Sequence, residues 1–355
     1  MKKWILMGGV LVTSFIIFLI LSCGDDIKPG YYGGENIFGK VKVFRYVNTK
    51  AAALEIDVDS EWKIFSGKNP DEINFSHPIL EGYGKGNFNV DVENSSRDYF
   101  QIITPNSMLI AAERELPMSG GFNFRDIGGY PTTDGKYVKW GKFIRSGNLN
   151  SLNRTDLIYL SSIPITTVAD FRGQEEITSN PDNYPSSVKY NYHFNIPKPD
   201  FASLDLPNLT PQMAIEIMKG INVKFVTDSA CIVRYREFFN ILQDESKTPV
   251  IFHCSGGKDR IGMASALILL ALGVDEETVI GDYMLSNNAL DNDKYDSLFV
   301  KSPILREFLI VKREYIEAGL TAIKSRYGSI ENFLRNELFI NLEDFRKKYL
   351  NIPEK

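Results

Sequence analysis

The sequence has 355 residues, 43% of them hydrophobic and 24% charged, which is typical of a globular protein with room for two ordinary domains. Its formal net charge of −5 argues against a general nucleic-acid binder, so any anion-binding site must be a local positive feature. The sequence contains neither a low-complexity tract nor an internal repeat, which excludes disordered and repeat architectures.

The first 22 residues have the layout of a secretory signal peptide, because two lysines precede an uncharged apolar run over residues 4–21. The run is close in length to a membrane span, so an uncleaved anchor is the alternative. The segment ILSC at residues 20–23 resembles a bacterial lipobox. That resemblance implies that Cys23 is lipidated and that residues 23–36 form a lipid-anchored linker. Both interpretations place the bulk of the protein in the cell envelope, outside the cytoplasm and tethered to a membrane.

An exported location permits disulfides, but the two remaining cysteines are too few to staple so long a chain. Cys231 lies in an apolar stretch with helical character, where we expect a small buried side chain. A disulfide between Cys231 and Cys254 that inactivates the protein is the alternative.

Residues 37–116 predict a small all-β sandwich, because short runs of alternating apolar and polar residues recur between turn clusters. The pattern resembles a fibronectin type III or similar immunoglobulin-like module. We expect no chemistry there, since His77 stands alone and a lone loop histidine is usually solvated. The predicted strands cover residues 41–47, 53–58, 62–65, 88–92, 99–103 and 108–112.

Over residues 117–355, strands alternate with long helical patterns, which predicts an α/β domain with a central, mostly parallel sheet flanked by helices. Residues 165–171 and 249–252 are short runs rich in β-branched residues, as in buried parallel strands. A Pro-rich stretch from residue 200 precedes a helix that begins near Thr210, and the two could form a lid. Further helices are predicted at residues 260–272, 275–285, 304–325, 330–336 and 342–350.

The sharpest motif is HCSGGKDR at residues 253–260, which follows a predicted strand and precedes a predicted helix. Gly256 and Gly257 let the backbone curl so that several N–H groups point to one centre. The helix N-terminus favours an anion there, and the Arg260 guanidinium can bind two phosphate oxygens at once. Such a positive cradle is expected to hold Cys254 as a nucleophilic thiolate.

The expected reaction is attack of the thiolate on phosphorus, followed by hydrolysis of the phosphocysteine by water. We expect neither a metal ion nor a cofactor, because the loop itself supplies the positive charge. The alternative interpretation is a structural glycine turn that happens to hold a buried cysteine.

The motif resembles the HC-x-x-G-K-D-R loop of atypical secreted bacterial tyrosine phosphatases. That family is reported to act on phosphotyrosine, sometimes on phosphoserine or phosphothreonine, and on phosphoinositides. The resemblance therefore implies a phosphorylated protein or phosphoinositide as substrate, and it covers about residues 121–350. Further segments similar to the family lie at residues 123–130, 141–147, 167–172, 282–288 and 327–329.

The resemblance implies that Cys254 is the nucleophile and that Arg260 binds phosphate. It also implies that Lys258 is a second cation, able to hold another phosphate, and that Asp259 acts in catalysis. His253 would hold the cysteine backbone and tune the thiolate. The remaining predicted phosphate-binding residues are Ser255, Gly256, Gly257, Ile261 and Gly262.

A leaving alkoxide needs a proton, so the reaction requires an acid. Asp259 lies within the loop and is the first candidate. Asp170, Asp200 and Asp205 are alternatives, the last two because an acid on a mobile lid is common in related phosphatases.

Structural roles are expected for two other family-like pairs. Arg125 and Asp126 precede two glycines and are typical of a turn with a salt bridge. Asp170 and Arg172 are expected to join a strand to its loop, and His193 to be a packed strand residue.

Ile261 departs from the family, which usually carries Thr or Ser after the arginine. That hydroxyl bonds to the cysteine sulfur and helps it leave, so Ile261 predicts slow turnover. This keeps open a catalytically weak, phosphatase-like protein that binds phosphorylated ligands. A sulfurtransferase or arsenate reductase is a third class, against which the run Lys258-Asp259-Arg260 argues.

Overall fold

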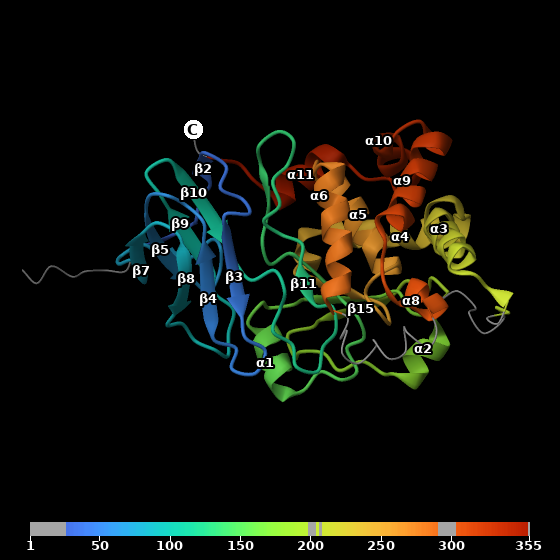
Figure 1. Ribbon diagram of the computed structural model, residues 1–355, viewed down its shortest axis with the longest axis horizontal. Helices are drawn as coiled ribbons and strands as arrows, with labels where there is room; N and C mark the ends of the chain where they lie inside the picture. The colour runs from blue at the N-terminus through green and yellow to red at the C-terminus, as the bar shows by residue number, and fades with distance from the viewer. Residues whose placement is uncertain (1–25, 198–203, 206–207, 290–302, 354–355) are drawn as a thin grey trace, which may run out of the picture.

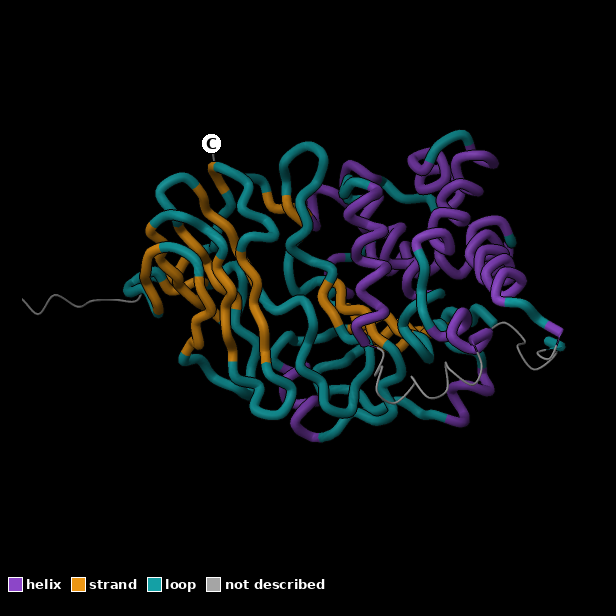
Figure 2. The backbone as a smooth tube through the Cα atoms, viewed as in Figure 1, coloured by secondary structure: helices purple, strands orange, loops and turns teal. Residues whose placement is uncertain are grey.

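The computed structural model describes residues 26–197, 204–205, 208–289 and 303–353. The predicted signal peptide, Cys23 and Asp200 lie outside these residues. Most strands gather in one half of the molecule, and most helices surround a smaller group of strands in the other (Figure 2). Within the described ranges, no helix combines the length and the apolar character that a bilayer crossing requires.

The N-terminal half consists of two antiparallel sheets that enclose a shared core (Figure 1). One sheet has the order β1-β6-β5-β9-β10-β2, with β7 paired to β5, and the other has the order β3-β4-β8. The strands are β1 (Ile27–Lys28), β2 (Gly33–Gly34), β3 (Val41–Arg45), β4 (Ala52–Ile56), β5 (Glu61–Gly67), β6 (Ile73–Asn74), β7 (Leu80–Tyr83), β8 (Gly86–Val90), β9 (Tyr99–Ile103) and β10 (Ser107–Ala111).

Alternation explains which of these strands the sequence predicted. Val41 and Val43 of β3 are buried while Lys42 and Phe44 between them are exposed, so one face packs on the core. The six predicted strands all form within one or two residues of their expected bounds. The prediction missed β7, whose residues are largely exposed and therefore carry no alternating pattern, and the strands β1, β2 and β6, whose two residues are too few to show one.

The C-terminal half is built on a five-stranded sheet of order β11-β13-β16-β14-β15. Strands β13, β16, β14 and β15 pair in parallel, and β11 is an antiparallel edge. A two-stranded ribbon of β12 and β17 lies beside it. The bounds are β11 (Arg125–Asp126), β12 (Tyr137–Val138), β13 (Phe143–Ser146), β14 (Thr167–Asp170), β15 (Tyr190–His193), β16 (Val250–His253) and β17 (Leu350–Asn351).

Helices cover both faces of this sheet, so its strands are apolar on both sides. In β16, Val250 and Phe252 belong to the core under most of the helices, whereas Ile251 packs into the smaller core under α1. The helices are α1 (Arg154–Ser161), α2 (Gln174–Ser179), α3 (Pro211–Thr227), α4 (Ser229–Leu242), α5 (Arg260–Ala271), α6 (Glu276–Met284), α8 (Pro303–Leu309), α9 (Arg313–Tyr327), α10 (Ile330–Asn332) and α11 (Leu342–Tyr349).

The prediction of one helix over residues 304–325 is wrong. The helix is interrupted between α8 and α9. There the Asn287 side chain accepts a hydrogen bond from the Val311 N–H at 2.8 Å and donates one to the Val311 carbonyl oxygen at 2.9 Å. These bonds replace the helical partners of Val311, so the helix ends there.

Buried charges join the two halves. Arg97, at the start of β9, is fully buried and places Nη1 2.8 Å from Asp126 Oδ2 and Nε 3.1 Å from Glu113 Oε1. Trp140 adds a hydrogen bond from Nε1 to the carbonyl oxygen of Ile110 at 3.0 Å. Buried charges are tolerated only when they are paired, so these contacts hold the N-terminal sheets against the segment that carries β11.

Candidate active site

The motif at residues 253–260 forms a loop at the carboxyl end of β16, the central strand of the C-terminal sheet. Ligands bind at this edge of parallel sheets because loops and helix N-termini converge there. The loop leads into α5 at Arg260, and Asp259, the N-cap residue, makes no side-chain capping bond. The first N–H groups of α5 therefore have no cap within the described residues and can bind an anion.

Of the two glycines in the loop, only Gly257 is required by geometry. Its φ is +66°, and a Cβ there would lie 2.5 Å from the carbonyl carbon and oxygen of Ser146. Gly256 has no positive φ, and its nearest obstacle, Lys258 Cγ, lies 3.8 Å away. The expectation that both glycines let the backbone curl is therefore right only for Gly257.

Two side chains from outside the loop donate hydrogen bonds to its carbonyl oxygens. Asn123 Nδ2 donates to the oxygens of Gly256 at 3.2 Å and Gly257 at 3.0 Å, and Arg145 Nη2 donates to Gly257 at 2.8 Å. In a trans peptide the N–H points opposite to the C=O, so these bonds turn the following N–H groups inward. The Gly257 N–H accordingly donates to Cys254 Sγ at 3.3 Å.

One buried carboxylate supports the arginine that holds this loop. Asp282 Oδ2 lies 2.7 Å from Arg145 Nη1, and Tyr130 donates to Asp282 Oδ1 at 3.1 Å. Arg125 bonds to the Asn123 side chain and to Ser286. Burial and the neighbouring Arg125 lower the pKa of Arg145 to about 10. Burial opposes ionisation of Asp282, but Arg125 and Arg145 outweigh it and lower its pKa.

Arg260 is held at one end, which fixes the orientation of its guanidinium. Nη1 donates to the carbonyl oxygens of Ile196 at 3.0 Å and Phe171 at 3.2 Å. Glu176 of α2 receives Nη1 at 2.8 Å and Nη2 at 2.9 Å. Glu176 also accepts from the Ser255 hydroxyl, so it ties both ends of the loop to α2. Nε has no partner among the described residues, which leaves that edge for a phosphate oxygen.

His253 contacts carboxylates rather than the cysteine sulfur. Its Nε2 lies 3.2 Å from Asp182 Oδ2 and 3.7 Å from Asp170 Oδ1. The expectation that His253 tunes the thiolate directly has no support in these contacts. The three residues come close enough to suggest a metal site. However, Arg172 Nη2 lies 2.8 Å from both carboxylates and already neutralises them.

Asp259 is the acid candidate that the structure leaves best placed. Its Oδ2 lies 2.7 Å from Lys258 Nζ, and its buried Oδ1 has no hydrogen-bond partner among the described residues. Asp170 is unsuitable, because it is fully buried; burial opposes its ionisation, but Arg172 lowers its pKa and keeps it charged. Asp205 bonds to Asn208 in the loop before α3.

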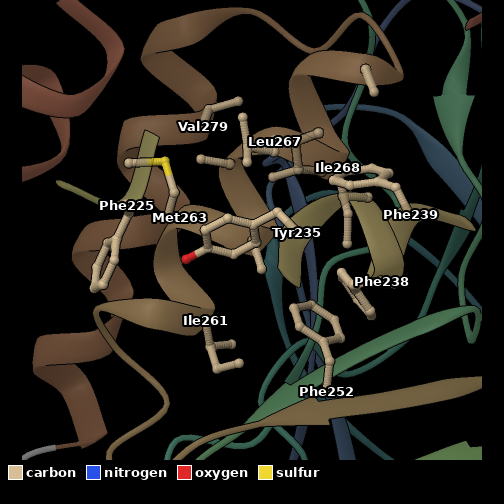
Figure 3. Packing of buried hydrophobic residues seen from close by; sticks show 14 of the residues in the cluster. Phe225, Tyr235, Phe238, Phe239, Phe252, Ile261, Met263, Leu267, Ile268 and Val279 are labelled. Atoms are coloured by element: carbon tan, nitrogen blue, oxygen red, sulfur yellow. The ribbon is translucent and has the colours of Figure 1, made fainter. Parts of the chain in front are cut away.

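Two predicted phosphate-binding residues have packing roles. Ile261 is fully buried and belongs to the apolar cluster around Tyr235 and Phe252 (Figure 3), so its side chain cannot contact phosphate. A Cβ on Gly262 would lie 2.6 Å from the Tyr283 ring, so this glycine lets α5 approach α6. Both can contribute only backbone N–H groups to the site.

The two described cysteines are free, so the structure contains no disulfide between them. Cys231 is buried in α4 as expected, and burial raises its pKa to about 11. It therefore remains a thiol, whereas Cys254 faces the loop N–H groups.

The sequence did not identify Glu176 or Asn123 as site residues. Glu176 stands in a short, mostly polar helix, and nothing in its spacing from Arg260 relates the two. Asn123 belongs to a family-like segment, and its φ of +56° is a conformation that asparagine tolerates. That preference is the one signal that could have singled it out.

Comparison with known proteins identifies relatives over the C-terminal half. A family model described as "Tyrosine phosphatase family" matches residues 116–351. A Cupriavidus necator protein described as a tyrosine-protein phosphatase is 28% identical over 257 residues, covering 69% of this chain and 92% of that protein. The triple specificity protein phosphatase PtpB of Mycobacterium tuberculosis is 27% identical over 272 residues, covering 63% and 94%.

A crystal structure of P. aeruginosa TpbA in complex with pTyr matches 49% of this chain and 88% of its own, at 14% identity. The TM-score between the two structures is 0.23.

The different backbone requirements of Gly256 and Gly257 can be tested by substituting each with alanine. Gly257→Ala should weaken binding of inorganic phosphate roughly 10- to 100-fold, because the added Cβ strains the loop by about 1–3 kcal/mol. Gly256→Ala should change the affinity by less than about twofold, since its Cβ enters open space. Isothermal titration calorimetry measures both, and equal effects of the two substitutions would contradict the assignment.

The pairing of Glu176 predicts a pH dependence of stability. Burial opposes ionisation of Glu176, but Arg260 and Ser255 outweigh it and lower its pKa from 4.5 to about 2. A depressed pKa stabilises the fold above pH 4.5, and the contribution is lost as the pH falls toward 2. Urea unfolding should show a smaller acid-induced loss of stability for Glu176→Gln than for the wild type. The exposed neighbour Glu175→Gln is the control, and an unchanged slope for Glu176→Gln would refute the prediction.

Proposed function

The chain belongs to the tyrosine phosphatase family, and from that premise we propose that it hydrolyses phosphate monoesters through a phosphocysteine at Cys254. The proposed substrates are phosphotyrosine proteins, phosphoinositides or both. The observation that carries the proposal is the loop itself: the Gly257 N–H reaches Cys254 Sγ while Arg260 is oriented beside it. An uncapped α5 adds further donors for a phosphate dianion.

In the proposed mechanism, inward N–H groups of the loop and the Arg260 Nε edge bind the non-bridging phosphate oxygens. The Cys254 thiolate attacks phosphorus, so a sulfur–phosphorus bond forms as the ester oxygen leaves. Water then attacks the phosphocysteine, which releases inorganic phosphate and restores the thiolate. Asn123 and Arg145 contribute by holding the loop in shape before substrate arrives.

Asp259 is proposed to protonate the leaving oxygen. Its contact with Lys258 places it at the edge of the loop, next to the first turn of α5. A carboxyl group there can give its proton to an alkoxide or phenoxide and later accept one from water.

The breadth of substrates is part of the proposal. The relative from M. tuberculosis is described as having triple specificity, and Lys258 offers this chain a second cation near the loop. Lys258 could bind an additional phosphate on an inositol ring, which would favour phosphoinositides over simple aryl phosphates. The exported, lipid-anchored location expected for Cys23 would place such an enzyme at a membrane, and fractionation of the native cells would test it.

A second candidate function is recognition of phosphorylated ligands with little turnover. Ile261 favours it, because the residue after Arg260 has no hydroxyl to offer the sulfur and is buried in the core. The binding half of the chemistry does not depend on that hydroxyl.

The proposed function is tested with p-nitrophenyl phosphate, a phosphotyrosine peptide and a phosphoinositide. We expect turnover by the wild type and its loss in Cys254→Ser, since serine is a far weaker nucleophile without a base. Cys231→Ala should retain activity because that thiol lies in α4, outside the loop. Binding without cysteine-dependent turnover would favour the second candidate.

The role of Asp259 depends on the leaving group. Asp259→Asn should slow hydrolysis of phenyl phosphate about 100-fold but that of p-nitrophenyl phosphate only slightly, because p-nitrophenolate leaves without a proton. Asp205→Asn is the matched control and should affect neither ester. If both esters slowed equally in Asp259→Asn, Asp259 would not be the acid.

Ile261 allows the release step to be tested with isosteric variants. Ile261→Thr should raise kcat about tenfold, because a hydroxyl near the sulfur stabilises the departing thiolate by about 1–1.5 kcal/mol. Ile261→Val has the same shape without the hydroxyl and should leave kcat near the wild-type value. Steady-state kinetics decide, and a threonine variant no faster than the valine variant would count against this account.

A further inference from the structure

A groove crosses the surface between the N-terminal sheets and the catalytic loop. Its first part is a hollow of about 490 Å³ between β3 and β10, lined by apolar residues such as Phe44 and Trp140. Its second part is a hollow of about 260 Å³ that reaches Phe122 and Asn123. Glu115 and Leu285 line both hollows, so the two adjoin, and together we call them the β3 groove.

The β3 groove ends against the catalytic loop. Phe122 lines its second part with a ring that is partly exposed. A Cβ built on Gly147 would lie 3.0 Å from Phe122 Cδ1 and 3.1 Å from the Ser255 carbonyl oxygen, so ring and loop border the same point. Asn123, the next residue, bonds the loop carbonyl oxygens of Gly256 and Gly257.

The lining suits an extended polypeptide. Phe44 is 44% exposed and Val47 is 45% exposed, which leaves apolar surface open along the end of β3. Charged side chains interrupt it, because Lys42 and Arg114 line one part and Glu115 lines both. β3 is the last strand of its sheet, and a bridge from Val43 to Glu113 already occupies part of its outer edge. An extended peptide can match a lining of mixed apolar and charged side chains with its own, whereas acyl chains gain nothing from interspersed charges.

We propose that the β3 groove binds the polypeptide that flanks the phosphorylated residue of a protein substrate. The proposal rests on the phosphatase activity proposed above, and it gives the N-terminal sheets a part in substrate choice. The family model begins at residue 116, so β3 and β10 lie outside the region shared with the family. Because the groove reaches Phe122 beside the loop, a peptide bound in it would extend toward Cys254.

Binding is measured by fluorescence polarisation on the full chain carrying Cys254→Ser. The probe is a phosphotyrosine peptide with about eight residues on each side, in which leucine and valine alternate with serine and lysine, as a strand requires. Its affinity should exceed that of free phosphotyrosine at least tenfold. Adding Phe44→Ser and Val47→Ser should lower the affinity for the peptide about tenfold, because apolar burial is lost. The affinity for inorganic phosphate should stay within about twofold of the value without these substitutions.

Tyr83→Ser is the matched control. Tyr83 lies on β7 of the same half, is more exposed than Phe44 and does not line the groove. It should change neither affinity. Equal binding of peptide and free phosphotyrosine would overturn the proposal. Two other results for the groove variant would also overturn it. If only binding to phosphoinositide vesicles were impaired, the occupant would be a lipid. If self-association in sedimentation were abolished instead, the occupant would be a second copy of the chain.

The two proposals can fail separately. A wild type without turnover whose Cys254→Ser form still prefers the long peptide would refute the phosphatase proposal and support the groove. An active enzyme with no preference for flanking residues would refute the groove alone.

Discussion

The candidate site depends on the bonds that hold the carbonyl oxygens of Gly256 and Gly257 outward. Asn123 and Arg145 provide them, and the rigid peptide plane then turns the N–H groups toward Cys254. A loop without these bonds would have to expose its carbonyl oxygens to an arriving phosphate, and like partial charges would repel it. The outward orientation of the loop carbonyl oxygens is therefore set by side chains that lie outside the loop.

Those neighbours are themselves held by paired charges. Asp282 neutralises Arg145, while Arg125 positions Asn123. The residue after Arg125 is Asp126, which pairs with Arg97 of the N-terminal half. Buried ion pairs therefore lie on both sides of the peptide that joins Arg125 and Asp126, one toward the N-terminal sheets and the others toward the loop at residues 253–260. Because a buried charge without its partner is strongly unfavourable, this arrangement couples the position of one half to the geometry of the other.

Glu176 has a comparable role for Arg260. A guanidinium has five N–H donors, and Glu176 together with two carbonyl oxygens occupies the end of the side chain. The Nε edge remains for the substrate, so the arginine is oriented before it binds. The short helix α2 is polar and exposed along most of its length, and its structural role is to hold Glu176 beside Arg260.

The sequence by itself determined the local features. The alternation in β3, the apolar run of β16 and the order strand, loop, helix around Cys254 follow from the periodicity and glycine content of neighbouring residues. Family-like motifs pointed to Cys254, Arg260 and a phosphate ester as substrate. Local patterns also identified six strands of the N-terminal sheets, but they missed β7, which is exposed and has no alternation, and the two-residue strands β1, β2 and β6.

Only the tertiary structure decided how distant residues meet. Glu176 lies 84 positions before Arg260, and Asn123 lies 133 positions before Gly256, so no spacing rule relates them. The fold also assigned Gly262 and Ile261 to packing, because what faces a helix residue is set by its neighbours in space. Hydrogen bonds and packing depend on the three-dimensional arrangement of the strands and helices, and a single sequence records that arrangement only through its local consequences.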